Sequence, residues 1–254
     1  LQGQVDSYWL GIKDVDFENY LKYGTLPFTI ALRNEPLIYS QINQTLNSVL
    51  NRDVPQLNTF DKQTIDKLSQ VLYMVASYDT TSFNTISQNI GLDIRTVGSI
   101  FDALEKTELL LKIFPYAPHE GQVRKASKFL FSSPAFRSMY YNLVGSTSTF
   151  EKYKGKLFED VIGLYLYRIF SRTADASITY DSAQKGADFI IGTGLAGQDG
   201  IVIEASLGDK NYAQVYNTME KTNARYGFTI SPDGLKLADD KRCLSVPLKY
   251  FLLI

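Results

Sequence analysis

The chain has 254 residues, of which 44% are hydrophobic and 13% aromatic, and a chain of this length favours two domains. Its 26 lysine and arginine residues nearly balance 27 aspartate and glutamate residues, for a formal net charge of −1. This balance excludes an overall field that would draw the chain to nucleic acid or to an anionic membrane, so such binding has to come from a local patch.

No apolar run approaches the roughly 18 to 20 residues that a membrane-spanning helix needs, and no signal sequence begins the chain. Cys243 is the single cysteine and can form no internal disulfide, which is typical of proteins in the reducing cytoplasm. We therefore expect a cytoplasmic protein with no membrane partner. Because the first residue is Leu1 rather than methionine, we also expect a further segment before it.

The first segment predicts short helical pieces. Apolar residues at mixed helical spacing, between about residues 14 and 50, are interrupted by Gly24 and Pro27. The turn-like segment 51–55 follows them. We interpret residues 1–57 as a helical connector.

The next segment has a helix-turn-helix pattern. A helix that Asp61 or Thr59 can cap is predicted by an apolar stripe. A short helix at residues 85–89 then leads through Gly91, which suits a left-handed turn, into a second helix at about 95–105. The stripe consists of Ile65, Leu68, Val71, Leu72 and Val75.

Two strands and a helix follow. Residues 109–114 and 123–131 are interpreted as strands around a turn, which would form a wing, and Pro134 opens a helix that reaches Leu143. Helices followed by a hairpin indicate a winged-helix domain, to which we assign residues 58–144.

The last segment, residues 145–254, alternates helices and strands. Residues 157–170 form a helix that is apolar nearly all round, so we expect it to pack against a sheet. A second helix is predicted at residues 213–225. The alternation of these helices with strands predicts an α/β domain, in a chain that is α+β overall. The predicted strands are 178–180, 188–191, 201–205, 228–230 and 244–246.

Three acidic residues of this segment stand in apolar sequence: Glu159, Asp188 and Glu204. An ionised carboxylate in an apolar strand is costly unless it is paired or coordinated. The three residues are therefore candidate ligands for Mg²⁺, which prefers oxygen ligands. Two strand carboxylates that hold such a metal can activate water and stabilise the charge that develops on phosphate during hydrolysis.

An acid on a helix, an Asp on one strand and a Glu on the next strand resemble the pattern of the PD-(D/E)XK nuclease superfamily. The chain looks most like the C-terminal region of archaeal-type AAA+ ATPases. The resemblance implies an upstream ATPase domain in the same protein, then a winged helix, then a restriction-endonuclease-like domain with a mixed sheet. Further matching segments are residues 20–27, 51–55, 104–110 and 155–159.

The chain departs from that pattern at Ser206, because the family has a lysine two residues after the strand Glu. A neutral hydroxyl cannot replace an ammonium in stabilising developing negative charge. Lys210, in the loop that follows, is the candidate substitute, so the candidate catalytic set is Asp188, Glu204 and Lys210. Cleavage, metal binding without efficient cleavage, and a purely structural role all stay open.

Each of the three acids also has a possible structural role that needs no metal. Glu159 can cap its helix. Asp188 and Glu204 can pair with cations elsewhere in the chain. The candidate cations are Lys185, Lys210 and Arg225.

The sequence lacks the residues that other common kinds of catalytic site require. The phosphate-binding pattern Gly-x-x-x-x-Gly-Lys-Ser/Thr is absent, so no ATPase motif is present. The single histidine, His119, lies in the predicted wing turn, so neither a histidine metal site nor a serine triad can be assembled. Cys243 has no thiol or histidine near it in the sequence, and we interpret it as a buried filler.

Candidate DNA contacts lie on the second helix of the helix-turn-helix and on the wing. Such a helix can enter the major groove while cations of the wing meet phosphates. Winged helices also dock on proteins, so the pattern supports both functions. The helix presents Arg95, Thr96, Ser99 and Lys106, and the wing adds Arg124, Lys125 and Lys128.

The leading hypothesis is a DNA-associated C-terminal module of an AAA+ ATPase, whose nuclease-like domain binds Mg²⁺ and duplex DNA. The alternative is a protein-interaction module that targets or regulates the upstream ATPase domain without nuclease activity. The sequence leaves open whether the chain forms a homo-oligomer.

Overall fold

The computed structural model shows a mixed α/β chain and describes residues 7, 9, 13–78, 82–117, 126–143, 149–173, 176–193, 200–208, 212–232 and 234–253. The chain divides into two compact units. The helical unit consists of Asn19–Ile113 and Val123–Leu164, and the sheet unit of Leu1–Glu18, Phe114–Gln122 and Tyr165–Ile254.

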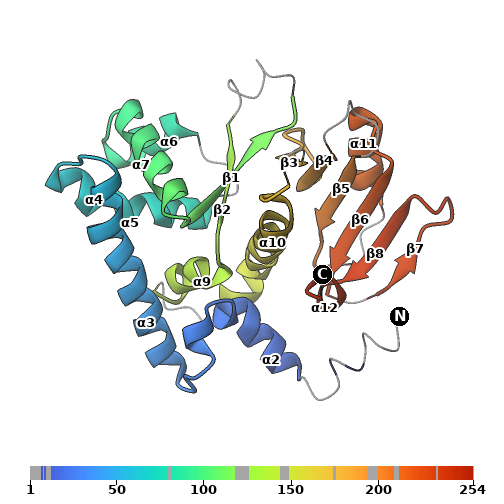
Figure 1. Cartoon of the computed structure of the whole chain (residues 1–254), viewed down its shortest axis with the longest axis horizontal. Helices are drawn as coiled ribbons and strands as arrows, with labels where there is room; N and C mark the ends of the chain where they lie inside the picture. Colours follow the sequence, from blue (N-terminus) through green and yellow to red (C-terminus); the bar gives the residue numbers. More distant parts are fainter. Residues whose placement is uncertain are drawn as a thin grey trace. The chain divides into compact units, whose positions relative to one another are not determined.

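The helical unit contains most of the helices (Figure 1). Three elements cross a boundary between the units along the chain: α2 (Asp14–Asn19), β1 (Leu110–Pro115) and α10 (Thr149–Phe170). The other elements of this unit are the π-helical turn η1 (Tyr20–Gly24), the 3-10 turn η2 (Pro27–Thr29), α3 (Glu35–Ser48), the π-helical turn η3 (Val49–Asp53), α4 (Val54–Leu57), α5 (Lys62–Ser77), α6 (Phe83–Ile90), α7 (Ile94–Lys106), β2 (Lys128–Phe131) and α9 (Pro134–Leu143).

Side-chain caps explain where the helices of the predicted helix-turn-helix begin. The Asp61 carboxylate accepts a hydrogen bond from the Thr64 N–H at 2.7 Å and so caps α5, while Ser82 and Asp93 cap α6 and α7 in the same way. Helix α6 ends at Gly91, whose φ of 70° lies in the left-handed region that glycine adopts without strain. The left-handed turn predicted at Gly91 is confirmed.

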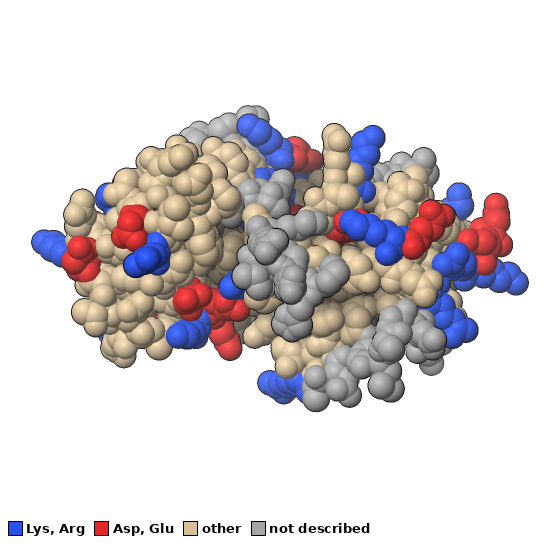
Figure 2. Space-filling view, turned by 90° about the horizontal axis from the view of Figure 1, so that it is seen from above, with Lys and Arg blue, Asp and Glu red and all other residues tan. Residues whose placement is uncertain are grey.

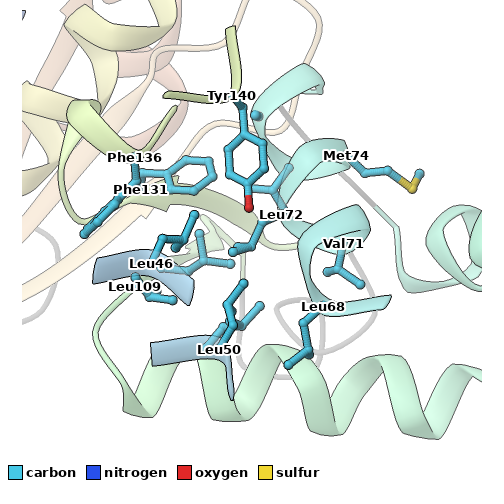
Figure 3. Close-up of a cluster of buried hydrophobic side chains, with 14 of the residues drawn as sticks. Leu46, Leu50, Leu68, Val71, Leu72, Met74, Leu109, Phe131, Phe136 and Tyr140 are labelled. Carbon is cyan, nitrogen blue, oxygen red and sulfur yellow. The ribbon is translucent and has the colours of Figure 1, made fainter. Parts of the chain in front are cut away.

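The core of the helical unit is built from leucine and aromatic side chains. Figure 3 shows side chains from the α3 end, α5, β2 and α9 gathered in this core. Burial of each such side chain contributes about 1.5–3 kcal/mol to folding. The labelled residues are Leu46, Leu50, Leu68, Val71, Leu72, Met74, Leu109, Phe131, Phe136 and Tyr140.

A buried ion pair crosses this core. Arg137 Nε donates to Asp160 Oδ2 at 2.5 Å and Arg137 Nη2 to Asp160 Oδ1 at 2.9 Å, and the two residues are only 2% and 0% exposed. Arg137 Nη1 also donates to the carbonyl oxygens of Val75 and Ala76, and Asp160 accepts from the Phe131 N–H. The pair therefore ties α5, β2, α9 and α10 together.

The strands are hydrogen-bonded in the order β2-β1-β3-β4-β5-β6-β8-β7. Strand β1 pairs with β2 through its first residues, and through Phe114 and Pro115 it pairs with β3 in the sheet unit. The elements of the sheet unit are β3 (Ala176–Tyr180), β4 (Phe189–Thr193), β5 (Ile201–Ala205), α11 (Ala213–Thr222), β6 (Tyr226–Ser231), β7 (Lys236–Leu237), β8 (Cys243–Pro247) and α12 (Leu248–Phe251). Strand β4 runs antiparallel to both of its neighbours, β3 and β5. Strand β6 runs parallel to both of its neighbours, β5 and β8.

Helix α11 packs closely on β5 and β6 (Figure 1). The close approach requires Gly227 on β6, because a Cβ atom there would lie 2.2 Å from the side chain of Val215 on α11. The buried cluster beneath α11 also includes Ile190 of β4 and Val202 of β5. Side chains along a strand alternate between the two faces of the sheet. The face covered by α11 therefore carries Ile190 and every second residue from it on β4, and Val202 and every second residue from it on β5.

The predicted fold class is confirmed as a mixed α/β chain, while the division into units differs from the predicted boundaries. The predicted connector, residues 1–57, and the predicted winged-helix domain, residues 58–144, fall largely into one helical unit. That unit also takes α10 as far as Leu164, which the prediction assigned to residues 145–254. Leu157 of α10 lies in the core of the helical unit, and Asp160 is held there by its ion pair with Arg137.

Candidate functional site

Asp188 and Glu204 lie at the same end of two neighbouring antiparallel strands. Phe189 of β4 pairs with Ile203 of β5, and one further step along both strands places Asp188 opposite Glu204. Side chains directly opposite each other share one face, with Cβ atoms about 4.5–5.5 Å apart. The Ala205 N–H donates to Asp188 Oδ2 at 3.0 Å and holds that carboxylate against β5. The structure thus brings two of the predicted site residues together.

Gln214 of α11 completes this arrangement, and the sequence analysis missed it. Its Nε2 atom donates to Glu204 Oε2 at 2.9 Å and to the carbonyl oxygen of Gly186 at 2.8 Å. Glu204 is only 3% exposed, so this amide satisfies a buried carboxylate oxygen. The signal for Gln214 was its spacing to Thr218 and Lys221, because positions i, i+4 and i+7 of a helix lie on one side.

A third carboxylate, Asp181, anchors the loop that leads to Asp188. The Thr218 hydroxyl donates to Asp181 Oδ2 at 3.0 Å, and Asp181 also forms an ion pair with Lys221. Burial alone would raise the pKa of Asp181, but the hydrogen bonds from Lys221, the Ala183 N–H and Thr218 outweigh it and lower this pKa below 3.8. Asp181 therefore holds the loop on α11.

The position that departs from the family pattern is buried. Ser206 is 1% exposed, and its hydroxyl donates to the carbonyl oxygen of Gly208 at 2.8 Å. This hydroxyl is committed to its own turn. Lys210, the predicted substitute cation, lies outside the described residues.

Glu159, the third predicted metal ligand, has a cation as its partner in the structure. Glu159 forms an ion pair with Lys128, whose side chain is 7% exposed. Lys128, one of the predicted DNA contacts, is therefore buried and paired with Glu159. Among the residues that the structure describes, no three His, Cys, Asp or Glu side chains lie close enough together to hold a metal ion.

The backbone of Arg225, one of the cations named as a possible partner of the strand acids, lies at the other end of β5. The Arg225 N–H donates to the carbonyl oxygen of Gly200, just before β5 begins, whereas Glu204 lies near the end of β5. At about 3.3 Å per residue, the two positions are separated by most of the length of the strand. Lys185, the other described candidate, is exposed.

The remaining pair, Asp188 and Glu204, has the chemistry of a Mg²⁺ site that is completed by other oxygens. Mg²⁺ in proteins is commonly bound by one or two carboxylates, with waters and substrate phosphate oxygens as its other ligands. The residues present fit such an ion, because two carboxylates share one face at the end of β4 and β5. A metal bound there would supply charge to a phosphate oxygen and to a bound water.

The predicted DNA-reading helix, α7, presents a charge-balanced surface. Arg95 and Lys106 are exposed, but so are the acidic residues Asp102 and Glu105. Asp102 lies on the same side of the helix as Arg95, seven residues after it. Thr96 donates its hydroxyl to the capping carboxylate of Asp93, and Ser99 is half-buried. Arg124 and Lys125 of the predicted wing, and His119, lie outside the described residues.

The charges on one face of the molecule are mixed. On the face that Figure 2 shows, lysine and arginine side chains are interspersed with aspartate and glutamate among the coloured residues. Cys243 is buried, and burial raises the pKa of its thiol, as expected for an inert filler. Within the described residues, no helix has the length and apolar character needed to cross a membrane.

The helical unit contains one further feature of note, an open pocket of about 390 Å³. No charged side chain lines it, so it offers neither metal ligands nor cations for phosphate. Its lining residues are Ser69, Gln70, Tyr73, Met74, Asn89, Ile90 and Tyr140.

The chain is similar to uncharacterized protein MJ1637 of Methanocaldococcus jannaschii, with 34% identity over 246 residues. The alignment covers 96% of this chain and 50% of that protein, so the chain spans about half the length of the curated relative that it matches. No solved structure matches the chain. A family model described as "Domain of unknown function (DUF8612)" matches residues 14–146. Because this match covers more than half of the 254 residues, the chain belongs to the DUF8612 family.

Proposed function

We propose that the sheet unit binds a divalent cation, Mg²⁺ in the cell, through Asp188 and Glu204, and through that cation the phosphate backbone of duplex DNA. The chain is then a DNA-associated C-terminal module of a longer protein, with an AAA+ ATPase domain upstream as the resemblance implies. The relative from Methanocaldococcus jannaschii has room for such a domain, because the chain matches only 50% of its length.

The observation that supports this proposal is the placement of Asp188 opposite Glu204 on the same face of β4 and β5. Two carboxylates so close repel each other and are costly to keep ionised unless a cation or donors offset their charge. Gln214 and the Ala205 N–H each donate one hydrogen bond. A divalent cation bound by both carboxylates would offset their charge.

Metal-dependent binding is favoured over efficient cleavage. Cleavage of a phosphodiester needs a base or a cation to position and activate water, and the residue at the family position is Ser206, whose hydroxyl is committed to Gly208. The sheet unit is accordingly proposed as a degenerate nuclease-like domain that retains its metal.

The experiment is a titration of the protein into a fluorescein-labelled DNA duplex, followed by anisotropy, in Mg²⁺ and in EDTA. The proposal expects tighter binding in Mg²⁺ for the wild type and equal, weak binding in both buffers for the Asp188→Asn variant. Asp239→Asn, which removes an exposed carboxylate from the β7–β8 turn of the same unit, is the matched control. Binding that does not depend on Mg²⁺ in the wild type would contradict the proposal.

A second candidate function is favoured by the charge-balanced surface of α7. The exposed cations Arg95 and Lys106 are balanced by the exposed acids Asp102 and Glu105, and a surface without net charge suits a protein partner better than a phosphate backbone. In this case the helical unit docks on protein and targets or regulates the upstream domain. Absence of DNA binding in Mg²⁺, together with binding to the separately expressed upstream part of the longer protein, would support it.

A further inference from the structure

Helices α5, α6 and α9 line the open pocket of the helical unit, and contacts within the unit fix these helices to one another. Lys67 of α5 donates from Nζ to the carbonyl oxygens of Ile90 and Gly91, at 2.8 and 3.3 Å, and holds the end of α6 against α5. Tyr140 of α9 meets Tyr73 of α5 edge to ring, with ring centroids 6.4 Å apart. The pocket is therefore a built part of the folded unit.

The pocket combines aromatic, apolar and neutral polar side chains. Tyr73, which is 47% exposed, and the buried side chains of Met74 and Ile90 offer apolar surface. An aromatic ring packs well on such a surface, because it pairs with other rings and makes favourable contacts with methionine sulfur. The exposed side chains of Gln70 and Asn89 add amide groups, which can both donate and accept hydrogen bonds. The volume of about 390 Å³ lies at the small end of the range for ligand pockets, about 300–1,000 Å³, so it suits one ring better than a large molecule.

A pair of hydroxyls adds a hydrogen-bond donor to the pocket wall. The Tyr140 hydroxyl is buried and has no hydrogen-bond partner among the described residues, in a side chain that extends from α9 toward α5 (Figure 3). Burial raises the pKa of Tyr140 to about 12, against a smaller opposite effect of the nearby Ser69 hydroxyl, so Tyr140 is protonated at neutral pH. Ser69 is exposed, and a serine hydroxyl can accept one hydrogen bond while it donates another. Ser69 can therefore accept from Tyr140 and donate to a ligand in the pocket.

The lining favours an uncharged group. No charged side chain of the described residues lines the pocket, so a carboxylate, an ammonium or a guanidinium would lose water there without gaining a partner. A base of a nucleic acid strand could stack on Tyr73, but each base brings a phosphate, and sites that bind single strands supply cations for it. A tyrosine side chain of a protein partner brings an aromatic ring, a hydroxyl and no charge, and tyrosine anchors many protein interfaces.

We infer that this pocket binds a tyrosine side chain of a protein partner, whose phenol oxygen accepts a hydrogen bond from Ser69. The inference rests on the second candidate function, in which the helical unit docks on protein, and it adds the chemistry of the contact. It does not depend on the proposed metal site at Asp188 and Glu204.

The methionines of the chain make the test specific. The 254 residues contain three: Met74 lines the pocket, Met139 lies in the core of the helical unit, and Met219 lies in the sheet unit. The whole chain, labelled with ¹³C at the methionine methyl groups, is titrated with N-acetyltyrosinamide and followed by NMR. We expect the Met74 signal alone to shift, with a dissociation constant on the order of 1 mM for one side chain without its protein. N-Acetylargininamide is expected to leave all three signals in place.

Substitutions isolate the hydroxyl contact. Tyr140→Phe and Ser69→Ala are each expected to weaken binding of N-acetyltyrosinamide about threefold to tenfold, the range for one neutral hydrogen bond, and to leave binding of N-acetylphenylalaninamide unchanged. Tyr78→Phe removes the hydroxyl of an exposed tyrosine just after α5 and should match the wild type. Tyr140→Phe should also keep the wild-type free energy of unfolding, because its hydroxyl has no partner to lose among the described residues.

The outcomes separate this inference from the second candidate function. A Met74 signal that does not move, or equal losses for the tyrosine and phenylalanine probes in Tyr140→Phe, would overturn the inference. A larger Met74 shift with deoxyadenosine than with N-acetyltyrosinamide would overturn it in favour of a nucleobase. Binding of the separately expressed upstream part of the longer protein that is unchanged in Ser69→Ala and Tyr140→Phe would overturn the role of the pocket and leave the second candidate function standing.

Discussion

Gln214 donates a hydrogen bond to Glu204 at 2.9 Å, and the same amide nitrogen reaches the Gly186 carbonyl oxygen at 2.8 Å. One side chain of α11 therefore sets the position of a buried carboxylate on β5 and of the loop that carries Lys185. The geometry of the candidate site therefore depends on the position of α11 on the sheet as well as on the acidic residues.

Replacement of Gln214 tests this dependence. Gln214→Ala removes a donor from a buried carboxylate, and we expect the free energy of unfolding to fall by about 1.5–3 kcal/mol, the range for hydrogen bonds to charged groups. Binding of Mn²⁺ should also weaken, because the Glu204 carboxylate is no longer held. Asn217→Ala, an exposed change on the same helix, is the control in urea unfolding and should leave both quantities unchanged.

The Asp181 pKa predicts how the stability of the sheet unit depends on pH. Because this pKa is lowered in the folded protein, the contribution of Asp181 is fully present above its ordinary pKa of about 3.8 and is lost as pH falls through the folded value. At neutral pH, Asp181→Asn should lower the free energy of unfolding by about 1–2 kcal/mol. The difference from wild type should shrink as pH falls below about 3.8. A difference that grew toward acid pH would contradict the assigned contacts.

The Arg137–Asp160 pair predicts a non-additive pair of substitutions in the helical unit. Arg137→Met leaves a buried carboxylate without its partner, which costs about 3–5 kcal/mol. Adding Asp160→Asn removes that uncompensated charge while keeping an oxygen for the Phe131 N–H, so the double variant should be more stable than Arg137→Met alone. Urea unfolding of the two single variants and the double variant measures the coupling, and strictly additive losses would sink this account of the pair.

Local chemistry made parts of the fold predictable from the sequence. Gly91 marks a left-handed turn whatever surrounds it, and the Asp61 cap and the stripe of α5 follow from helical spacing. The strand acids Asp188 and Glu204 were found because each interrupts a short apolar run, and such a residue needs a partner.

Contacts between distant residues were not predictable in the same way. Helix α10 is apolar nearly all round, so its pattern could not tell which of the neighbouring acids Glu159 and Asp160 faces which partner. The structure pairs Glu159 with Lys128 and Asp160 with Arg137, and both cations belong to other elements. Gln214 was missed because a single glutamine on a helix surface is ordinary until the sheet beneath it is known.

The account depends most on whether Asp188 and Glu204 share one cation. The most direct measurement is a calorimetric titration of Mn²⁺, which like Mg²⁺ prefers oxygen ligands, into the wild type and into Glu204→Gln. The account predicts one bound ion per chain in the wild type and an affinity at least about tenfold lower in the variant, a difference of about 1.4 kcal/mol. Equal binding by the two proteins, or no binding by the wild type, would contradict it.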